Sequence, residues 1–179
     1  MPYLQADPER VERWRQRIGG EGFKVGIAWQ GRPGKLDAGR SFALAAFEAI
    51  SGLANVRLIS LQKNQGSDQL ERLPEGMTVE TLGEDFDAGP DAFLDSAAVM
   101  ANLDLVISSD TAIAHLAGAL GRPVWVALKH VPDWRWLLDR PDSPWYPTMT
   151  LFRQPARGDW KNVFQSMADR LSVMTETTG

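Results

Sequence analysis

Short runs of apolar residues alternate along the chain with longer stretches in which apolar residues recur every three or four positions. The short runs predict buried strands, and the longer stretches predict helices that cover a sheet. The expected strands are residues 25–29, 56–61, 79–82, 105–108, 124–128 and 149–152, and the expected helices after the N-terminal segment are residues 42–50, 90–102, 111–120 and 160–173. This alternation predicts an α/β fold, namely a doubly wound, mostly parallel, Rossmann-like sheet of five or six strands.

The N-terminal segment carries both start and stop signals for a helix. Asp7 is a good N-cap, Pro8 suits the first helical position, and Gly19 ends the helix. One face of this helix is apolar, through Val11, Trp14 and Ile18. We therefore divide the chain into a connector helix, residues 1–20, and one domain, residues 21–179, without internal repeats.

Composition narrows the possible functions. The chain has 179 residues, of which 44% are hydrophobic, enough for one real core. The formal net charge of −4 gives no electrostatic reason to expect nucleic acid or an anionic membrane as partner. There is no cysteine and there are only two histidines, so we expect neither thiolate chemistry nor a metal site. No apolar stretch suggests a leader or a membrane span, and a cytoplasmic location is the default expectation.

The strongest candidates for ligand-binding residues lie in residues 105–128. An apolar strand runs into Asp110 and Thr111, which open a helix built of small residues. The unpaired N–H groups of such a helix start form an anion site, to which the Thr111 hydroxyl can add a donor. His115 lies one turn further on the same face. The simpler interpretation remains open, in which Asp110 only caps the helix and His115 is a satisfied core residue.

The same segment closely resembles the donor site of the heptosyltransferase-like family, which is glycosyltransferase family 9-like. In that family a strand ends in Asp-Thr-Gly, a His-Leu-Ala stretch follows, and a Gly-x-Pro turn leads to the next strand. The matching residues here are Asp110, Thr111 and Ala112, then His115-Leu-Ala and Gly121-Arg-Pro. Ala112 stands in the glycine position, which is a departure. The resemblance is most specific over residues 93–128, and it implies that this backbone holds the diphosphate of a nucleotide sugar.

Two further loops follow strands and are candidates for the same site. The resemblance implies a basic residue that reaches the donor phosphates from the loop after the first strand, and Arg40 matches best, with Lys35 as a rival. After the second strand, Gln62 and Lys63 are placed to contact a base or a phosphate. A solvated surface loop is the alternative for both.

A dense group of aromatic residues occupies residues 132–147. Trp134 and Trp136 are candidates for stacking on a base or sugar, or for packing against a partner domain, and they equally suit pinning a long loop to the core. Similar segments occur in bacterial proteins in which tetratricopeptide repeats precede a glycosyltransferase-like region.

The resemblance implies the C-terminal, donor-binding half of a metal-independent GT-B-type glycosyltransferase. We expect no cofactor other than the nucleotide sugar itself, and no metal; the pair Asp85 and Asp87 is better explained as helix caps than as a metal motif. An N-terminal acceptor-binding half or a tetratricopeptide region is the expected partner, and without it we expect little activity. The alternatives are a non-catalytic protein-interaction module and half of a nucleotide-sugar epimerase.

Overall fold

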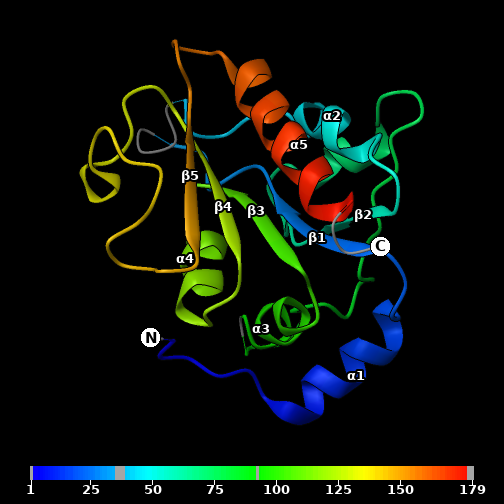
Figure 1. Cartoon of the computed structure of the whole chain (residues 1–179). Helices are drawn as coiled ribbons and strands as arrows, with labels where there is room; N and C mark the ends of the chain where they lie inside the picture. The colour runs from blue at the N-terminus through cyan, green and yellow to red at the C-terminus, as the bar shows by residue number, and fades with distance from the viewer. Residues whose placement is uncertain (1, 35–38, 92, 177–179) are drawn as a thin grey trace.

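The computed structural model describes residues 2–34, 39–91 and 93–176. Within them, five parallel strands form one sheet in the order β2-β1-β3-β4-β5 (Figure 1). The strands are β1 (Phe23–Ala28), β2 (Val56–Ser60), β3 (Leu105–Ser109), β4 (Val124–Leu128) and β5 (Met149–Arg153). The α/β class and the parallel sheet predicted from the apolar runs are thus confirmed.

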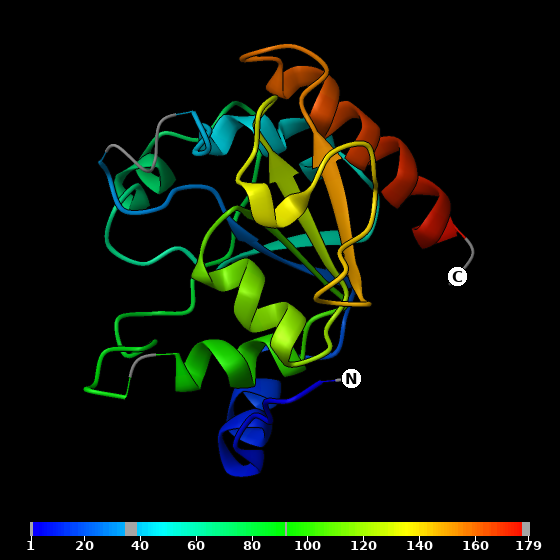
Figure 2. The same ribbon diagram turned by 90° about the vertical axis from the view of Figure 1, so that its left-hand side faces the viewer.

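Helices cover both faces of this sheet (Figures 1 and 2). The α-helices are α1 (Pro8–Ile18), α2 (Glu48–Ser51), α3 (Leu94–Ala101), α4 (Ala112–Ala119) and α5 (Trp160–Glu176), and the short 3-10 helices are η2 (Leu44–Phe47), η3 (Ser67–Glu71) and η4 (Trp134–Trp136). One core lies between the sheet and α2 with α5, and a second lies between the sheet and α3 with α4. Successive strand residues point to opposite cores because side chains alternate along a strand.

Strand β1 shows how closely this arrangement is packed. Val25 and Ile27 are fully buried in the core of α2 and α5. Gly26 faces the other way, where an added methyl carbon would lie 2.4 Å from Leu103 and 2.8 Å from Leu61. The absence of a side chain at Gly26 therefore lets these two leucines close over the middle of the sheet.

Helix α1 has the caps that the sequence predicts. The Asp7 side chain accepts from the Arg10 backbone N–H at 2.8 Å, and the helix ends at Gly19 with φ 77°. The helix packs against α3 (Figure 2). There the buried carboxylate of Asp95 accepts from Arg10 and from the Trp14 indole. The hydrogen bonds of Asp95 thus fix the N-terminal helix to the domain.

Three expected elements differ in the structure. The predicted strand at residues 79–82 is wrong, because only Glu80 pairs with the sheet, in an isolated bridge to Ile59. The helix expected at 42–50 is shorter and begins as the 3-10 turn η2. The helix expected at 90–102 begins only at Leu94, because Phe93 adopts the left-handed conformation with φ 70°.

The strand order places a ligand site. The chain leaves β1 toward one edge of the sheet and then returns to β3 on its other side, so β1 and β3 are neighbours whose connections diverge. In open parallel sheets the crevice at the carboxyl ends of such a strand pair binds ligands. In the described part of the chain, no helix has the length and apolarity needed to cross a membrane.

Candidate functional site

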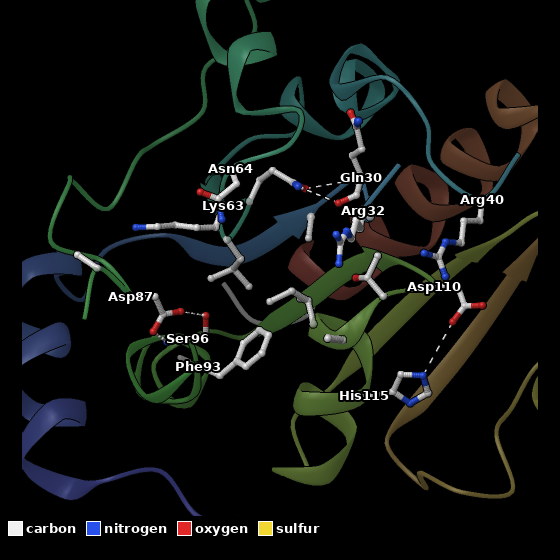
Figure 3. A pocket seen from close by; sticks show the side chains of 18 of the residues that line it. Gln30, Arg32, Arg40, Lys63, Asn64, Asp87, Phe93, Ser96, Asp110 and His115 are labelled. Carbon is white, nitrogen blue, oxygen red and sulfur yellow. Dashed lines mark hydrogen bonds and ion pairs between the residues drawn. The ribbon is translucent and has the colours of Figure 1, made fainter. Parts of the chain in front are cut away.

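A cavity of about 930 Å³ opens at the carboxyl ends of β1 and β3 (Figure 3). Its polar lining comes from the loops after β1, β2, β3 and β4, from the start of α3 and from α4. Polar and charged side chains that line it are Arg32, Arg40, Gln62, Lys63, Asp87, Ser96, Asp110, Thr111, His115 and Arg135. The cavity is large enough for a nucleotide-sized ligand.

The fold brings most of the predicted site residues together. Seven of them line this one cavity: Arg40, Gln62, Lys63, Asp110, Thr111, Ala112 and His115. Lys35, the rival to Arg40, lies outside the described residues. Figure 3 shows Arg40 reaching from the loop after β1 toward Asp110, whereas Arg32, from the same loop, lies nearer the middle of the cavity.

The start of α4 is open toward the cavity. Thr111 is its N-cap residue, and no described side chain caps the helix. The Thr111 hydroxyl lies 3.1 Å from Ser108 Oγ, whose own proton goes to the Ser109 carbonyl. The simpler interpretation, in which Asp110 only caps α4, is wrong, because its carboxylate lies beside His115, with 3.9 Å between Oδ1 and Nε2. The first N–H groups of α4 therefore have no side-chain cap among the described residues, an arrangement that suits an anion.

The start of α3, at the same cavity, is already satisfied. Asp87 accepts from the backbone N–H groups of Asp95 at 3.0 Å and Ser96 at 3.3 Å, and also bonds the Ser96 hydroxyl. Its carboxylate therefore occupies the position that an external anion would take. This confirms the interpretation of Asp87 as a cap. The same interpretation is wrong for Asp85, whose carboxylate instead accepts from Arg17 at 2.6 Å.

Gly31 brings Arg40 and Thr111 to one place. A methyl carbon added to Gly31 would lie 3.0 Å from the Arg40 guanidinium and 3.3 Å from the Thr111 methyl group. Both side chains therefore pack against the glycine, one from the loop after β1 and one from the start of α4. A guanidinium in this position places positive charge close to the open helix terminus.

Gln62 fastens two loops to each other. Its Oε1 accepts from the backbone N–H groups of Trp29 at 3.0 Å and Gln30 at 3.1 Å, while its Nε2 donates to the carbonyls of Gln30 and Gln65. The side chain lines the cavity, but these bonds use its amide to shape the wall.

Lys63 is likewise directed to the protein. Its ammonium donates to the Phe86 carbonyl and lies 5.8 Å from the centre of the Phe86 ring. In this structure it fastens the segment that carries Asp87.

His115 is held on several sides. Its ring stacks on Trp136, with centroids 5.3 Å apart and planes at 19°. Nδ1 lies 3.2 Å from the Tyr146 hydroxyl, and Nε2 lies 3.4 Å from Arg135 Nη1. A guanidinium only donates, so Nε2 accepts and Nδ1 carries the proton.

The electrostatics of this cluster favour neutral side chains. Burial lowers the pKa of His115 below its ordinary value of 6.5; Asp110 opposes this, and Arg135 adds to it. Burial and the hydrogen bond with Tyr3 raise the pKa of Tyr146 to about 12. Near pH 7 the cavity therefore presents a neutral imidazole beside the Asp110 carboxylate.

The two tryptophans proposed for stacking have different positions. Trp136 is fully buried beneath His115, so its proposed stacking on a ligand is wrong: its ring pins the loop to the core. Trp134 is 77% exposed and lines a separate shallow groove outside the cavity.

Sequence reasoning missed several residues of the site. Arg32 lies in a loop that the sequence singles out, yet nothing in the pattern distinguishes it. Phe93 faces the cavity because its left-handed backbone holds the ring there (Figure 3). Arg135 stands between the two tryptophans, and only the folding of residues 129–148 over α4 brings it to His115.

Comparison with known proteins finds chains of similar sequence. Residues 43–128 match the model of glycosyltransferase family 9 (heptosyltransferase). Protein FlbA of Caulobacter vibrioides is 32% identical over 177 residues, a match that covers 94% of this chain and 28% of FlbA. No metal-ligand group of three or more His, Asp or Glu side chains occurs among the described residues.

Solved structures show the same fold. Heptosyltransferase II of E. coli superposes with a TM-score of 0.67 at 14% identity, covering 99% of this chain and 54% of that one. A family 9 glycosyl transferase of Veillonella parvula gives 0.61 at 11% identity, covering 98% and 53%. The chain thus spans about half the length of these proteins and a smaller share of FlbA.

The fold and these matches define the class as an α/β domain of GT-B glycosyltransferase type, equivalent to one half of such a protein. More narrowly, residues 43–128 are similar to glycosyltransferase family 9, and the fold is similar to that of solved heptosyltransferases.

Proposed function

We propose that this domain binds the nucleoside diphosphate sugar that serves as donor in a glycosyl transfer. The donor's diphosphate lies at the start of α4 beside Arg40. The uncapped start of α4 carries this proposal, since α3 opens at the same cavity and is capped by Asp87. Among the described residues at this cavity, the start of α4 has N–H groups without a side-chain cap and the start of α3 does not, so a bound diphosphate would supply the acceptors that α4 lacks.

The residues around the helix start suit the remainder of a donor. Asp110 and the neutral His115 are hydrogen-bond acceptors, which are the partners that sugar hydroxyls require. At the other end of the cavity, the partly exposed ring of Phe93 offers an apolar surface for a base. We place the sugar near His115 and the base toward Phe93.

The diphosphate is held without a divalent metal in this proposal. Arg32, Arg40 and the N-terminus of α4 supply the positive potential that a leaving diphosphate requires. One similar structure is that of heptosyltransferase WaaC of E. coli with ADP-2-deoxy-2-fluoro heptose, a molecule of the proposed class.

Transfer itself needs an acceptor site that we place on another part of a longer protein. The chain matches about half of heptosyltransferase II, and the cavity described here contains the donor functions alone. We therefore expect the isolated domain to bind donor with little transferase activity. An N-terminal acceptor-binding half, or a tetratricopeptide-repeat region, is the proposed partner, in the cytoplasm, and residues 1–20 are the proposed connector to it.

The test is calorimetry of UDP-, ADP- and GDP-sugars with the domain in EDTA. We expect one nucleotide to bind, and Arg40→Met to weaken it about tenfold through loss of a charge-assisted contact. Arg157→Met is the matched control, since Arg157 is exposed and does not line the cavity. Binding that appears only with magnesium or manganese contradicts the metal-free site, and no binding of any nucleotide contradicts the donor function.

A second candidate function, a protein-interaction surface, has its own support. The loop that leads from β4 to β5 exposes five large apolar side chains: Val131, Trp134, Leu137, Leu138 and Trp145. Exposed apolar groups gathered in this way often mark interaction sites. Trp134→Ser with Leu138→Ser tests this in the full-length protein, where loss of a domain contact with unchanged nucleotide binding would support it.

A further inference from the structure

The loop between β4 and β5 contributes one cation to the cavity wall, Arg135. We propose that Arg135 is a further donor-binding residue, whose guanidinium takes a phosphate oxygen of the nucleoside diphosphate sugar. This inference rests on the function proposed above and adds to it a contact from an element other than the loop after β1.

The backbone at Arg135 is fixed. Its N–H donates to Asp133 Oδ1 at 3.1 Å, and its carbonyl accepts from the Trp145 indole at 2.9 Å. The next residue, Trp136, is fully buried under His115. The side chain therefore starts from a rigid position, which lowers the entropy that binding must overcome.

The guanidinium is oriented but not saturated. Nε donates to Asp133 Oδ1 at 2.9 Å, and Nη1 lies 3.4 Å from His115 Nε2. Within the described part of the chain, Nη2 has no hydrogen-bond partner, and the side chain is 39% exposed. Asp133 thus holds the Nε side of the Arg135 guanidinium, while Nη2 is available to a ligand.

The contact with His115 is one that an anion can replace. At 3.4 Å it is long for a hydrogen bond, and its acceptor is a neutral imidazole. A phosphate oxygen is a stronger acceptor for the same donor. His115 keeps its place after such an exchange, because Tyr146 and Trp136 still hold its ring.

The other charges of the cavity leave a role for this third arginine. Arg32 and Arg40 both come from the loop after β1, so they approach an anion from a single element. Asp87 is occupied at the start of α3, and Asp110 lies beside His115. A cation from the loop after β4 lets the protein grip a diphosphate from two elements, which fixes its orientation.

The experiment uses inorganic pyrophosphate as the probe, in EDTA, so that the result does not depend on the identity of the base. Calorimetry compares the wild-type chain with Arg135→Met and with Arg140→Met. Arg140 is the matched control because it lies in the same loop, pairs with the exposed Asp142 and does not line the cavity. We expect about tenfold weaker binding for Arg135→Met and unchanged binding for Arg140→Met.

A lysine variant and a ligand-free measurement separate contact from folding. Arg135→Lys keeps the charge without the fork, and we expect it to recover part of the affinity. NMR titration of His115 without ligand should show a higher pKa in Arg135→Met, because a positive neighbour has been removed. If Arg135→Met raises the His115 pKa but keeps wild-type pyrophosphate affinity, the proposal is overturned. Such a result would still show that Arg135 contacts His115 in the wild-type chain.

The proposed function fails separately. If Arg40→Met weakens pyrophosphate binding and Arg135→Met does not, only the role of Arg135 is wrong. If the wild-type chain binds neither pyrophosphate nor any nucleoside diphosphate, the donor site is wrong and the role of Arg135 falls with it.

Discussion

The carboxylates of Asp87 and Asp95 are linked through the start of α3: Asp87 accepts from the Asp95 N–H at 3.0 Å, and Asp95 accepts from the Asp87 N–H at 3.3 Å. Asp87 lines the cavity, whereas Asp95 receives Arg10, Arg13 and the Trp14 indole from α1. This pair of acids therefore links the N-terminal helix to the cavity wall.

Replacing Asp95 with asparagine should destabilise the domain by about 3 kcal/mol, because two arginines lose a buried anionic partner. Asp91→Asn is the control, since Asp91 is exposed and lies 3.8 Å from Arg10; it should change stability by less than about 0.5 kcal/mol. Urea unfolding at pH 7 measures both variants. Equal, small changes in the free energy of unfolding for the two variants would show that the bonds of Asp95 contribute little to stability.

The same carboxylate should make the domain sensitive to acid. Burial acts to raise the pKa of Asp95, but hydrogen bonds from Trp14 and Arg10 outweigh it, and the pKa lies below the ordinary 3.8. A lowered carboxyl pKa gives stability that is complete above pH 3.8 and is lost as the pH falls through the folded-state value. Asp95→Asn should therefore flatten the pH dependence of stability below pH 4, and an unchanged slope in that range would count against this assignment.

His115 should titrate below pH 6.5, and Asp110→Asn should lower its pKa further. Burial disfavours the imidazolium, and the Asp110 carboxylate is the group that opposes this effect. Because the folded-state pKa is lowered, the stability linked to His115 is complete above pH 6.5 and is lost as the pH falls. NMR titration of the ring protons measures this directly. A His115 pKa above 6.5 would contradict the neutral imidazole that the site requires.

Gly31→Ala should weaken nucleotide binding more than it weakens folding. The new methyl group would meet the Arg40 guanidinium at 3.0 Å, and the flexible end of that side chain must move away. We expect binding to fall several-fold and stability to change by less than about 1 kcal/mol. Gly20→Ala is the control, because an added carbon there meets no atom within 4 Å. Wild-type affinity in Gly31→Ala would separate Arg40 from the phosphate site.

Gln62→Met should reduce both stability and nucleotide affinity. The substitution keeps the size of the side chain but leaves the N–H groups of Trp29 and Gln30 without their acceptor, at a cost of about 2–4 kcal/mol. Gln65→Met is the control, since that side chain is exposed. Hydrogen exchange at Trp29 and Gln30 should rise in Gln62→Met alone. A loss of affinity without faster exchange would instead make Gln62 a direct ligand contact.

The strands and most helices could be predicted from the sequence because each carries its own signal. Residues 124–128 form a strand with the bounds that the apolar run indicates, and Asp7 caps α1 as its type and position predict. The failure at residues 79–82 has a physical reason: after the turn at Gly76 only Glu80 reaches β2, and Gly83, with φ 89°, turns the chain away. A short apolar run does not reveal how many partners it will find.

The site was predictable to the extent that it lies in strand-ending loops. Local sequence signals mark the segment that follows one strand and contains Asp110, Thr111 and His115. Arg40 is indicated by the resemblance to the heptosyltransferase-like family. Arg135 has no such signal, because its place in the cavity depends on its contact with His115 of α4, which lies 20 residues earlier in the sequence. Trp136 is a second example of a role that depends on tertiary structure. A tryptophan in a loop suits stacking on a ligand, and only its burial shows that it supports His115.

The central claim is that a diphosphate binds at the start of α4 and not at the start of α3. Amide ¹H–¹⁵N NMR spectra of the isotope-labelled domain, recorded in EDTA during titration with the nucleoside diphosphate that binds best, report on both helix termini at once. The account predicts large shifts at Thr111, Ala112 and Ile113, whose N–H groups would bond the anion, and small shifts at Asp95 and Ser96, whose N–H groups already bond Asp87. Unshifted amides at Thr111, Ala112 and Ile113 under saturating nucleotide would contradict it.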